Sequence, residues 1–435
     1  MYKLNKVKNF LFVNIDLLFL SIYFFSLPIA GITSIQSISL SIFIVIFLLK
    51  NYKNLQIKSI FFYKNILITF FILLTLALLS LFFTPDIHES VKEIKSELIK
   101  NFIIIAIFFL YTILNEKKIS SLLYIITIVL FSHTLINIYM WYINHMWPYR
   151  AGGLLDSGGG ERFGIWATYA LSIFLAFLFS KYKFFTIPFI GLSILSIFAN
   201  NTRATFLALI LILILFLIIF LKSNYLKIFL LLSTTISLLF FINYSQNFSA
   251  RYNAHSVATN LDLITKYSPK QDKNLVKKYD WDASVVVRLS MWKSVIIYRV
   301  QEPFLPKGYG RFVYGESIKN TFKDSPQNLP FKIFPQVHND FIGILYSLGI
   351  VGFLAFIYFL YYQLKISYRI FKKSKNESYK ILSIFIFFGS IGFITSIIFG
   401  SFFGDSEAKF FYPLYGLILG IYYKENENNE KLTLN

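Results

Sequence analysis

The sequence predicts an all-α polytopic membrane protein with about twelve transmembrane helices and one large, partly helical loop on the outer side. Of its 435 residues, 56% are hydrophobic and only 15% are charged, whereas soluble domains carry about 25% charged residues. Long apolar stretches recur along the whole chain, and about 20 helical residues cross a bilayer core of about 30 Å. Because every backbone amide inside lipid needs an internal partner, each apolar stretch is expected to be a helix.

These stretches divide the chain into two membrane segments around the loop. Residues 1–243 are expected to hold the first nine transmembrane helices, 244–338 the large loop, 339–423 the last three helices and 424–435 a cytoplasmic tail. The individual spans are expected near 10–27, 31–49, 65–83, 98–114, 120–143, 165–180, 184–199, 204–221, 228–243, 339–362, 381–400 and 410–423.

The distribution of lysines predicts the orientation of these helices. With a cytoplasmic N-terminus, every second loop is rich in lysine, and the opposite loops contain fewer basic residues, among them Lys92, Lys95 and Lys100. Under the positive-inside rule both termini are then cytoplasmic and 244–338 is outside. The lysine-rich groups are Lys3 to Lys8, Lys50 to Lys64, Lys117 and Lys118, Lys181 and Lys183, Lys222 and Lys227, and Lys365 to Lys380.

Composition also narrows the classes of function. The net charge of +20 is high enough for a nucleic-acid-binding protein, but the lysines follow the membrane topology, so no nucleic acid is expected as a partner. The chain has no cysteine, which excludes disulfides and thiolate metal sites. The outer loops contain no cluster of aspartate, glutamate and histidine, and neither a metal nor another cofactor is predicted. The first apolar run is long and is followed by others, so a cleavable signal peptide is not expected.

The large loop is expected to contain a helix. Val285, Leu289, Trp292, Ile296 and Val300 recur at helical spacing, and this apolar face would pack on the membrane domain or lie at the membrane surface. Asp282 is placed to cap the helix, and Pro303 and Pro306 are expected to end it.

Three residues at the outer side are candidates for chemistry. His338 and Asn339 directly precede the tenth span, where an imidazole titrates near neutrality. Arg203 lies at the outer mouth of the eighth span, and Arg288 lies on the loop helix. Each also has an ordinary explanation: an interfacial histidine without a task, a topological anchor and a solvated charge.

Two glycine-bearing stretches accompany these residues. Pro306 to Phe312 contains Gly308, Gly310 and Arg311 and predicts a turn that returns the chain to the membrane. Glycines allow a ligand to approach the backbone closely, although turn geometry explains them equally well. Arg150 opens the loop before the sixth span. The glycines at 158–160 lack the Gly-Lys-Ser/Thr of a phosphate-binding loop, and flexibility explains them better.

Together, these residues resemble the O-antigen ligase and polymerase superfamily over nearly the full length of the chain. The histidine motif of the ligases is matched by His338, Asn339, Gly349 and Gly352, and their Arg-x3-Leu motif by Arg203 and Leu207. Their loop arginine, with a following tryptophan and a glycine-bearing turn, is similar to Arg288, Trp292 and the stretch 306–312.

The resemblance implies an inverting, metal-independent glycosyl transfer at the periplasmic face of the bacterial inner membrane. The donor would be a glycan on undecaprenyl diphosphate and the acceptor a sugar hydroxyl of lipid A–core. His338 would be the general base, while Arg203 and Arg288 would neutralise the departing diphosphate. Substrate contacts are expected from Arg150, Asn339, Trp292, Gly308, Gly310 and Arg311.

Other functions stay open from the sequence. A polymerase that joins repeat units and a protein O-oligosaccharyltransferase belong to the same superfamily. A transporter or flippase would place ionisable groups in the middle of the membrane, where Asp16 and His133 are the candidates that stand out. Neighbouring helices can provide partners for both.

Overall fold

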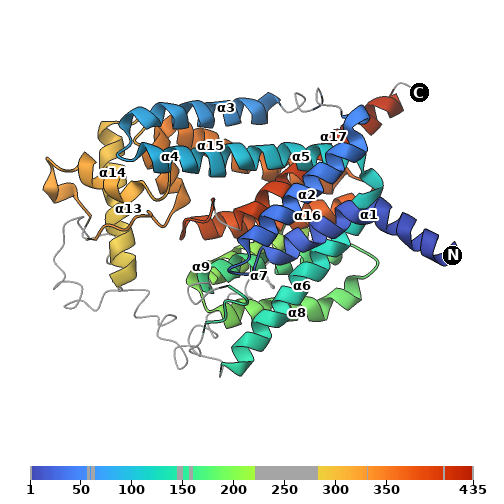
Figure 1. Cartoon of the computed structure of the whole chain (residues 1–435). Helices are drawn as coiled ribbons and strands as arrows, with labels where there is room; N and C mark the ends of the chain where they lie inside the picture. Colours follow the sequence, from blue (N-terminus) through green and yellow to red (C-terminus); the bar gives the residue numbers. More distant parts are fainter. Residues whose placement is uncertain are drawn as a thin grey trace.

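The computed structural model describes residues 2–55, 59, 64–144, 150–155, 160–220, 283–330, 332–404 and 407–433. Over these residues the chain is helical, and the one β contact among them is an isolated bridge between Ile29 and Leu154. The prediction of an all-α fold is therefore confirmed for the described part of the chain (Figure 1).

The helices follow the apolar stretches in order. The first group comprises α1 (Tyr2–Ser26), α2 (Thr33–Asn51), α3 (Lys64–Leu79), α4 (Ile87–Glu93), α5 (Lys100–Leu114), α6 (Ile119–Ile143), α7 (Gly160–Phe177), α8 (Lys183–Asn200) and α9 (Arg203–Phe220). The second comprises α13 (Ala283–Gln301), α14 (Tyr314–Thr321), α15 (Asp340–Lys373), α16 (Glu377–Ile397) and α17 (Ala408–Thr433). Short 3₁₀ turns occur at Tyr52–Asn54, Ser80–Phe83, Glu116–Lys118 and Pro326–Asn328, and a π-helical turn, Ile94–Ile99, joins α4 to α5.

The membrane character of the chain is confirmed by the helices themselves. Within the described residues, seven helices are long and apolar enough to cross a membrane, and three shorter helices are also apolar. A helix lies at each predicted span except 228–243, which falls outside the described residues. The total of twelve spans stays a prediction.

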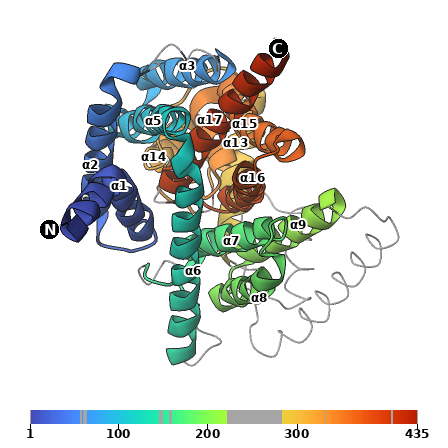
Figure 2. The same ribbon diagram turned by 90° about the vertical axis from the view of Figure 1, so that its right-hand side faces the viewer.

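The bundle is built around α16. This helix contacts α6, α7, α9, α15 and α17, and Figure 2 shows it surrounded by them. Of its most apolar stretch of 18 residues, 83% is buried inside the protein, as expected for a helix that is hydrophobic all round. Figure 1 shows the labelled ends of α1 and α17 at one end of the bundle and α13 and α14 at the other.

The helix before α5 begins earlier than the sequence predicts. Instead of a span at 98–114, one continuous helical segment runs from Ile87 to Leu114 through the π-helical turn. The sequence predicts a loop at Lys92 and Lys95, but the neighbouring Glu93 and Glu97 are buried and face Arg311 of the large loop. The helix continues through these two glutamates because Arg311, which is distant in the sequence, pairs with them.

The loop helix α13 is confirmed, but its packed face differs from the predicted one. Val287, Met291, Val295 and Tyr298 are buried against α14 and the start of α15. Of the predicted face, Ile296 is 50% and Val300 79% exposed. Apolar residues recur about every four positions on both faces of α13, so their spacing does not distinguish the faces. The tertiary contacts determine which face is packed. The helix ends at Gln301, before the first proline as predicted; Asp282, its predicted cap, lies outside the described residues.

The two ionisable residues considered for a transporter have partners in neighbouring helices. Asp16 of α1 accepts hydrogen bonds from Lys118 at 2.8 Å, from Lys50 at 3.3 Å and from Tyr111 at 3.1 Å. His133 of α6 has its Nε2 2.9 Å from the carbonyl oxygen of Phe25. Both contacts join α1 to other helices, which is a structural role.

Candidate active site at one end of the bundle

His338, two residues before the start of α15, has an unusual backbone conformation. Its φ is +56°, and Asn201 is the other non-glycine residue with positive φ in the described chain. Such conformations cost energy and are enriched at functional sites. Asn339 then caps α15, its side chain accepting a hydrogen bond of 3.0 Å from Ile342 N. The His-Asn pair therefore combines a constrained imidazole with the start of a helix.

Helix α13 is attached to the segment before His338. Trp292 donates from Nε1 to the carbonyl oxygen of Val337 at 3.1 Å, and the ring of Phe334 packs edge-on against the His338 imidazole at 5.4 Å. On the same helix, Arg288 donates to the carbonyl oxygen of Phe399 at 3.3 Å. The structure thus brings the helix that carries Arg288 to the segment that carries His338.

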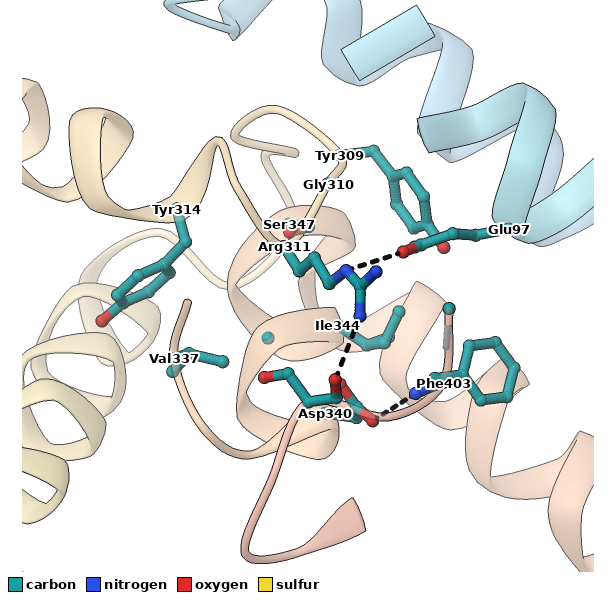
Figure 3. Close-up of a pocket in the computed structure, with 13 residues that line it drawn as sticks. Glu97, Tyr309, Gly310, Arg311, Tyr314, Val337, Asp340, Ile344, Ser347 and Phe403 are labelled. Atoms are coloured by element: carbon teal, nitrogen blue, oxygen red, sulfur yellow. Dashed lines mark hydrogen bonds and ion pairs between the residues drawn. The ribbon is translucent and has the colours of Figure 1, made fainter. Parts of the chain in front are cut away.

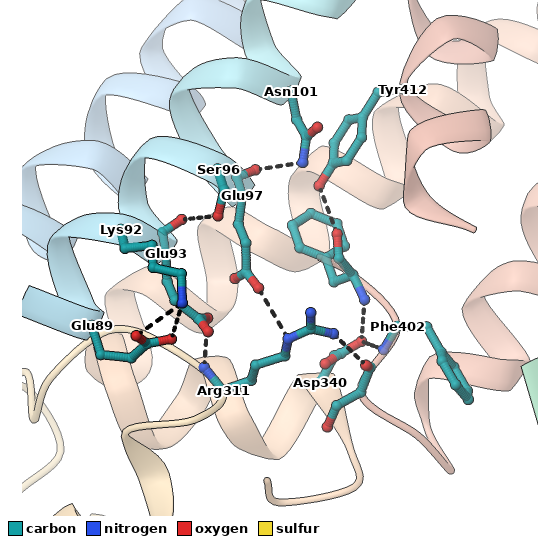
Figure 4. A network of polar contacts seen from close by, with 12 residues as sticks. Glu89, Lys92, Glu93, Ser96, Glu97, Asn101, Arg311, Asp340, Phe402 and Tyr412 are labelled. Carbon is teal, nitrogen blue, oxygen red and sulfur yellow. Dashed lines mark hydrogen bonds and ion pairs between the residues drawn. The ribbon is translucent and has the colours of Figure 1, made fainter. Parts of the chain in front are cut away.

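Several polar groups contact the described residues of the connection between α16 and α17, which are 398–404 and 407 (Figure 4). Arg311 donates to Ser401 O at 3.2 Å. Asp340 accepts from the backbone N–H groups of Phe402 and Phe403, both at 2.9 Å. At its far end, the fully buried Glu407 pairs with Arg162 of α7 at 3.1 Å. This connection was not singled out by the sequence.

Helix α15 is interrupted at Gly349, the first glycine of the histidine motif. Its φ is +71° and ψ −174°, a region that is essentially accessible to glycine alone. A Cβ there would lie 2.9 Å from the carbonyl oxygens of both Pro303 and Phe304. The chain after α13 therefore runs against the break and bonds to it, with Ile350 N donating to Pro303 O and Lys307 N to Ser347 O, both at 2.9 Å.

Arg299, which the sequence did not single out, completes this contact. Its guanidinium donates to the carbonyl oxygens of Glu302 and Leu305 at 2.7 Å each, and also to that of Tyr346. Burial lowers the pKa of Arg299 from its usual value, and carbonyl oxygens surround its charge. The partners of Arg299 are backbone carbonyl oxygens at and near the break in α15. Because only the tertiary structure brings these oxygens together, they could not be recognised in the sequence.

The glycine-bearing turn packs against the C-terminal ends of α3 and α4. Tyr309 N donates to Ser80 Oγ at 2.8 Å and Arg311 N to Glu93 Oε2 at 3.0 Å. Gly308 has φ +81°, and a Cβ there would lie 3.0 Å from the Thr84 side chain. Gly308 therefore allows the backbone of this turn to lie close to Thr84 of the protein itself.

A narrow cavity of about 30 Å³ opens beside this turn (Figure 3). Arg311 lies across it with Nε 3.5 Å from Glu97 Oε1, and Asp340, Ile344 and Phe403 line the opposite wall. Tyr309 is also part of the wall, and burial raises its pKa. A water molecule needs about 10–15 Å³ by this measure, so the cavity has room for water and not for a sugar.

Arg203 lies at a second group of polar residues, which also includes the Arg150 segment. Ala151 N donates to Ala199 O at 3.0 Å, and Asn200 Nδ2 donates to Ala151 O at 3.1 Å. Asn201 takes the left-handed conformation that ends α8, and α9 begins at Arg203, whose side chain is exposed. The structure therefore places Arg150 next to the turn that presents Arg203.

The start of α7 links the two groups. Arg162 pairs with Glu407, and Gly164, two residues later, packs against Asn200 and Thr205. The turn before Arg203 and the 398–407 connection therefore meet on one turn of α7. Within the described residues, no group of three or more histidine, aspartate or glutamate side chains is arranged to hold a metal ion.

Fold and site together define a multi-pass helical membrane protein that gathers arginines and a histidine at one end of its bundle. Residues 188–357 match the family model described as O-antigen ligase. The match includes Arg203, Arg288, His338 and Gly349, and it confirms the resemblance to the O-antigen ligase superfamily. It supports a membrane glycosyltransferase of the ligase or polymerase type. None of the curated proteins matches the chain.

Proposed function

We propose that this protein is an O-antigen ligase that transfers a glycan from undecaprenyl diphosphate to a sugar hydroxyl of lipid A–core at the periplasmic face of the inner membrane. The observation that carries the proposal is the family match, which spans both arginines and the histidine. The attachment of the Arg288 helix to the segment before His338 adds support.

In the proposed reaction the acceptor hydroxyl oxygen attacks the anomeric carbon from the face opposite the diphosphate. The new glycosidic C–O bond forms as the glycosyl–phosphate C–O bond breaks, with inversion at that carbon. The bonding electron pair leaves on the diphosphate oxygen, and the hydroxyl proton passes to a base. The protein must therefore stabilise a departing anion and accept one proton.

Arg203 and Arg288 are assigned to the anion. Arg203 is exposed and Arg288 half-buried, so a lipid-linked diphosphate has access to the guanidinium of Arg203. A planar guanidinium forms paired, charge-assisted hydrogen bonds to phosphate oxygens, which an ammonium does not reproduce. Removing one such stabiliser typically costs about 3–4 kcal/mol of barrier.

His338 is assigned as the general base, a role worth about 10²–10⁴ in rate. Its strained backbone, its aromatic neighbour Phe334 and the cap at Asn339 all restrict where the imidazole lies. Such restriction favours a residue that must meet one hydroxyl in one geometry.

The remaining assigned residues fall into two groups, those proposed to act on the substrate and those that have contacts within the protein. We assign donor or acceptor contacts to Arg150, beside the Arg203 turn, and an indirect electrostatic contribution to Arg311, which pairs with Glu97. Asn339, Trp292, Gly308 and Gly310 have contacts within the protein, and in the proposal they hold the frame of the substrate site.

The test of the base is transfer by purified His338→Ala with saturating donor and acceptor, from about pH 5.5 to about pH 9. Transfer should fall by at least about 10²-fold, while the lipid-linked donor still binds, since the arginines hold the diphosphate. The wild type should lose activity at acidic pH through a group near the reference histidine value of about 6.5. Activity of the variant within about tenfold of wild type would remove the base role.

The arginines are tested by Arg203→Lys and Arg288→Lys, which retain the charge. Both should be severely impaired at normal protein levels. Arg369→Lys, at the opposite end of α15, is the matched control and should transfer normally. Near-normal transfer by both site variants would reduce these arginines to topological anchors.

Orientation and acceptor need separate tests. A phosphatase fused after Lys270 should be active and one fused after Ser374 silent, because the lysine distribution requires 244–338 to be periplasmic. The alternatives are an O-antigen polymerase or a protein O-oligosaccharyltransferase, and less so a transporter. In a deletion strain, loss of the whole lipopolysaccharide ladder indicates a ligase, and a band with a single repeat unit indicates a polymerase.

A further inference from the structure

A groove separate from the candidate active site runs between α2 and the helical segment from Ile87 to Leu114. Its volume is about 640 Å³. The floor is apolar and formed by Leu40 and Ile44 of α2 with Ile99, Ile103 and Ile104 of the facing segment. None of the residues assigned to the proposed glycosyl transfer lines this groove.

The mouth of the groove is positively charged. Lys92, Lys95 and Lys100 line it, and the lysine distribution along the chain predicts that they lie outside, where lysine is disfavoured. Lys92 pairs with Glu89 at 3.0 Å. Lys95 and Lys100 are exposed, and neither has an anionic partner among the residues that the structure describes.

The helical segment that contains the π-helical turn borders the groove on one face and the protein interior on the other. Glu93 and Glu97 face inward to Arg311, whereas Lys92 pairs with Glu89 (Figure 4). Lys95, Ile99 and Ile103, spaced by four residues, line the groove on the outward side. They extend along about 12 Å of helix. Single π turns of this kind are frequent at functional sites.

We propose that this groove binds an anionic, phosphate-bearing membrane lipid. The phosphate lies between the ammonium groups of Lys95 and Lys100, and one acyl chain lies on the isoleucine and leucine floor. Charge complementarity at the mouth and an apolar floor below it match the two chemically distinct ends of such a lipid. A lipid bound there braces the helical segment whose inner face holds Arg311.

The test is direct lipid binding to the purified full-length chain in detergent, which needs neither donor nor turnover. Phosphatidylglycerol and phosphatidylcholine with the same acyl chains are titrated and bound lipid is counted by native mass spectrometry. The wild type should prefer phosphatidylglycerol. Each lysine near an anionic lipid contributes roughly fivefold in affinity, so Lys95→Gln with Lys100→Gln should weaken phosphatidylglycerol binding roughly 30-fold.

A matched control and a groove-filling variant make the result specific. Lys319→Gln with Lys323→Gln removes two exposed lysines of the large loop and should leave binding unchanged. Ile103→Trp fills the floor and should weaken binding of both lipids, with Ile44→Trp as a second variant from the facing helix.

Three results would overturn the proposal. The first is equal affinity of the wild type for the two lipids. The second is an equal loss of affinity in the two double lysine variants. The third is a loss of affinity in Lys95→Gln with Lys100→Gln but in neither tryptophan variant. The last would mean attraction to surface charge alone. Because glycan transfer is not measured, failure here is distinct from failure of the proposed ligase activity.

Discussion

Replacing Gly349 by alanine should break the contact between α15 and the chain that follows α13. Gly349 sits at φ +71° and ψ −174°, and an added Cβ would be 2.9 Å from the carbonyl oxygens of Pro303 and Phe304. The alanine keeps the strained backbone conformation, and the segment at 303–307 must also move away to make room for the added Cβ. When it moves, Ile350 N loses its hydrogen bond to Pro303 O.

The size of the effect follows from these two terms. A non-glycine residue in this region of φ and ψ costs about 1–3 kcal/mol, and loss of one backbone hydrogen bond adds about 1 kcal/mol. Gly349→Ala should therefore destabilise the protein by about 2–4 kcal/mol. Transfer should also fall, because the first segment of α15 positions His338.

The assay is retention of the monodisperse protein in detergent after heating, followed by fluorescence-detected size exclusion. Gly191→Ala in α8 is the matched control, since a Cβ there meets no atom within 4 Å. It should be neutral or up to about 1 kcal/mol more stable. If Gly349→Ala is as stable and as active as this control, the break in α15 does not depend on glycine and the reasoning is refuted.

Other perturbations have equally definite outcomes. Trp292→Phe retains the ring packing but removes the donor to Val337 O, so transfer at normal protein levels should fall by about fivefold, equivalent to about 1 kcal/mol. Asp16→Asn removes the carboxylate that pairs with Lys50 and Lys118 and should cost about 1–3 kcal/mol of stability. Transfer per folded molecule should be unchanged in Asp16→Asn, and a selective loss of function would favour the transporter. Chelators such as EDTA should leave transfer unaffected, and inhibition that added Mg²⁺ reverses would contradict a metal-independent reaction.

The helices and part of the site could be predicted from the sequence. Apolar stretches of membrane length gave the position of every described span, and the order of His338, Arg203 and Arg288 gave the resemblance that the family match confirmed. The start of the helix at Ile87 was missed because the stretch with Lys92 and Lys95 was predicted to be a loop, and the pairing of Glu93 and Glu97 with Arg311 exists only in the tertiary structure. The packed face of α13 was missed because two faces of that helix are apolar.

The contacts that shape the site join residues far apart in the chain. Asp340 bonds to Phe402 and Phe403, Arg162 pairs with Glu407, and the turn before Arg203 meets the Arg150 segment. No local pattern encodes such pairings, because each depends on how helices and loops distant in the sequence pack together.

The sequence by itself determined the membrane class, the helical character and the likeness to one superfamily. Those properties depend on hydrophobic length and on the order of a few residues, which are one-dimensional. Only the tertiary structure decided that the motif glycine Gly349 breaks α15, that Arg299 and the chain after α13 fill the break, and that Lys95 and Lys100 border an apolar groove. In each case one helix leaves backbone groups without partners or a surface uncovered. Whether another segment contacts them depends on the folded arrangement of the chain.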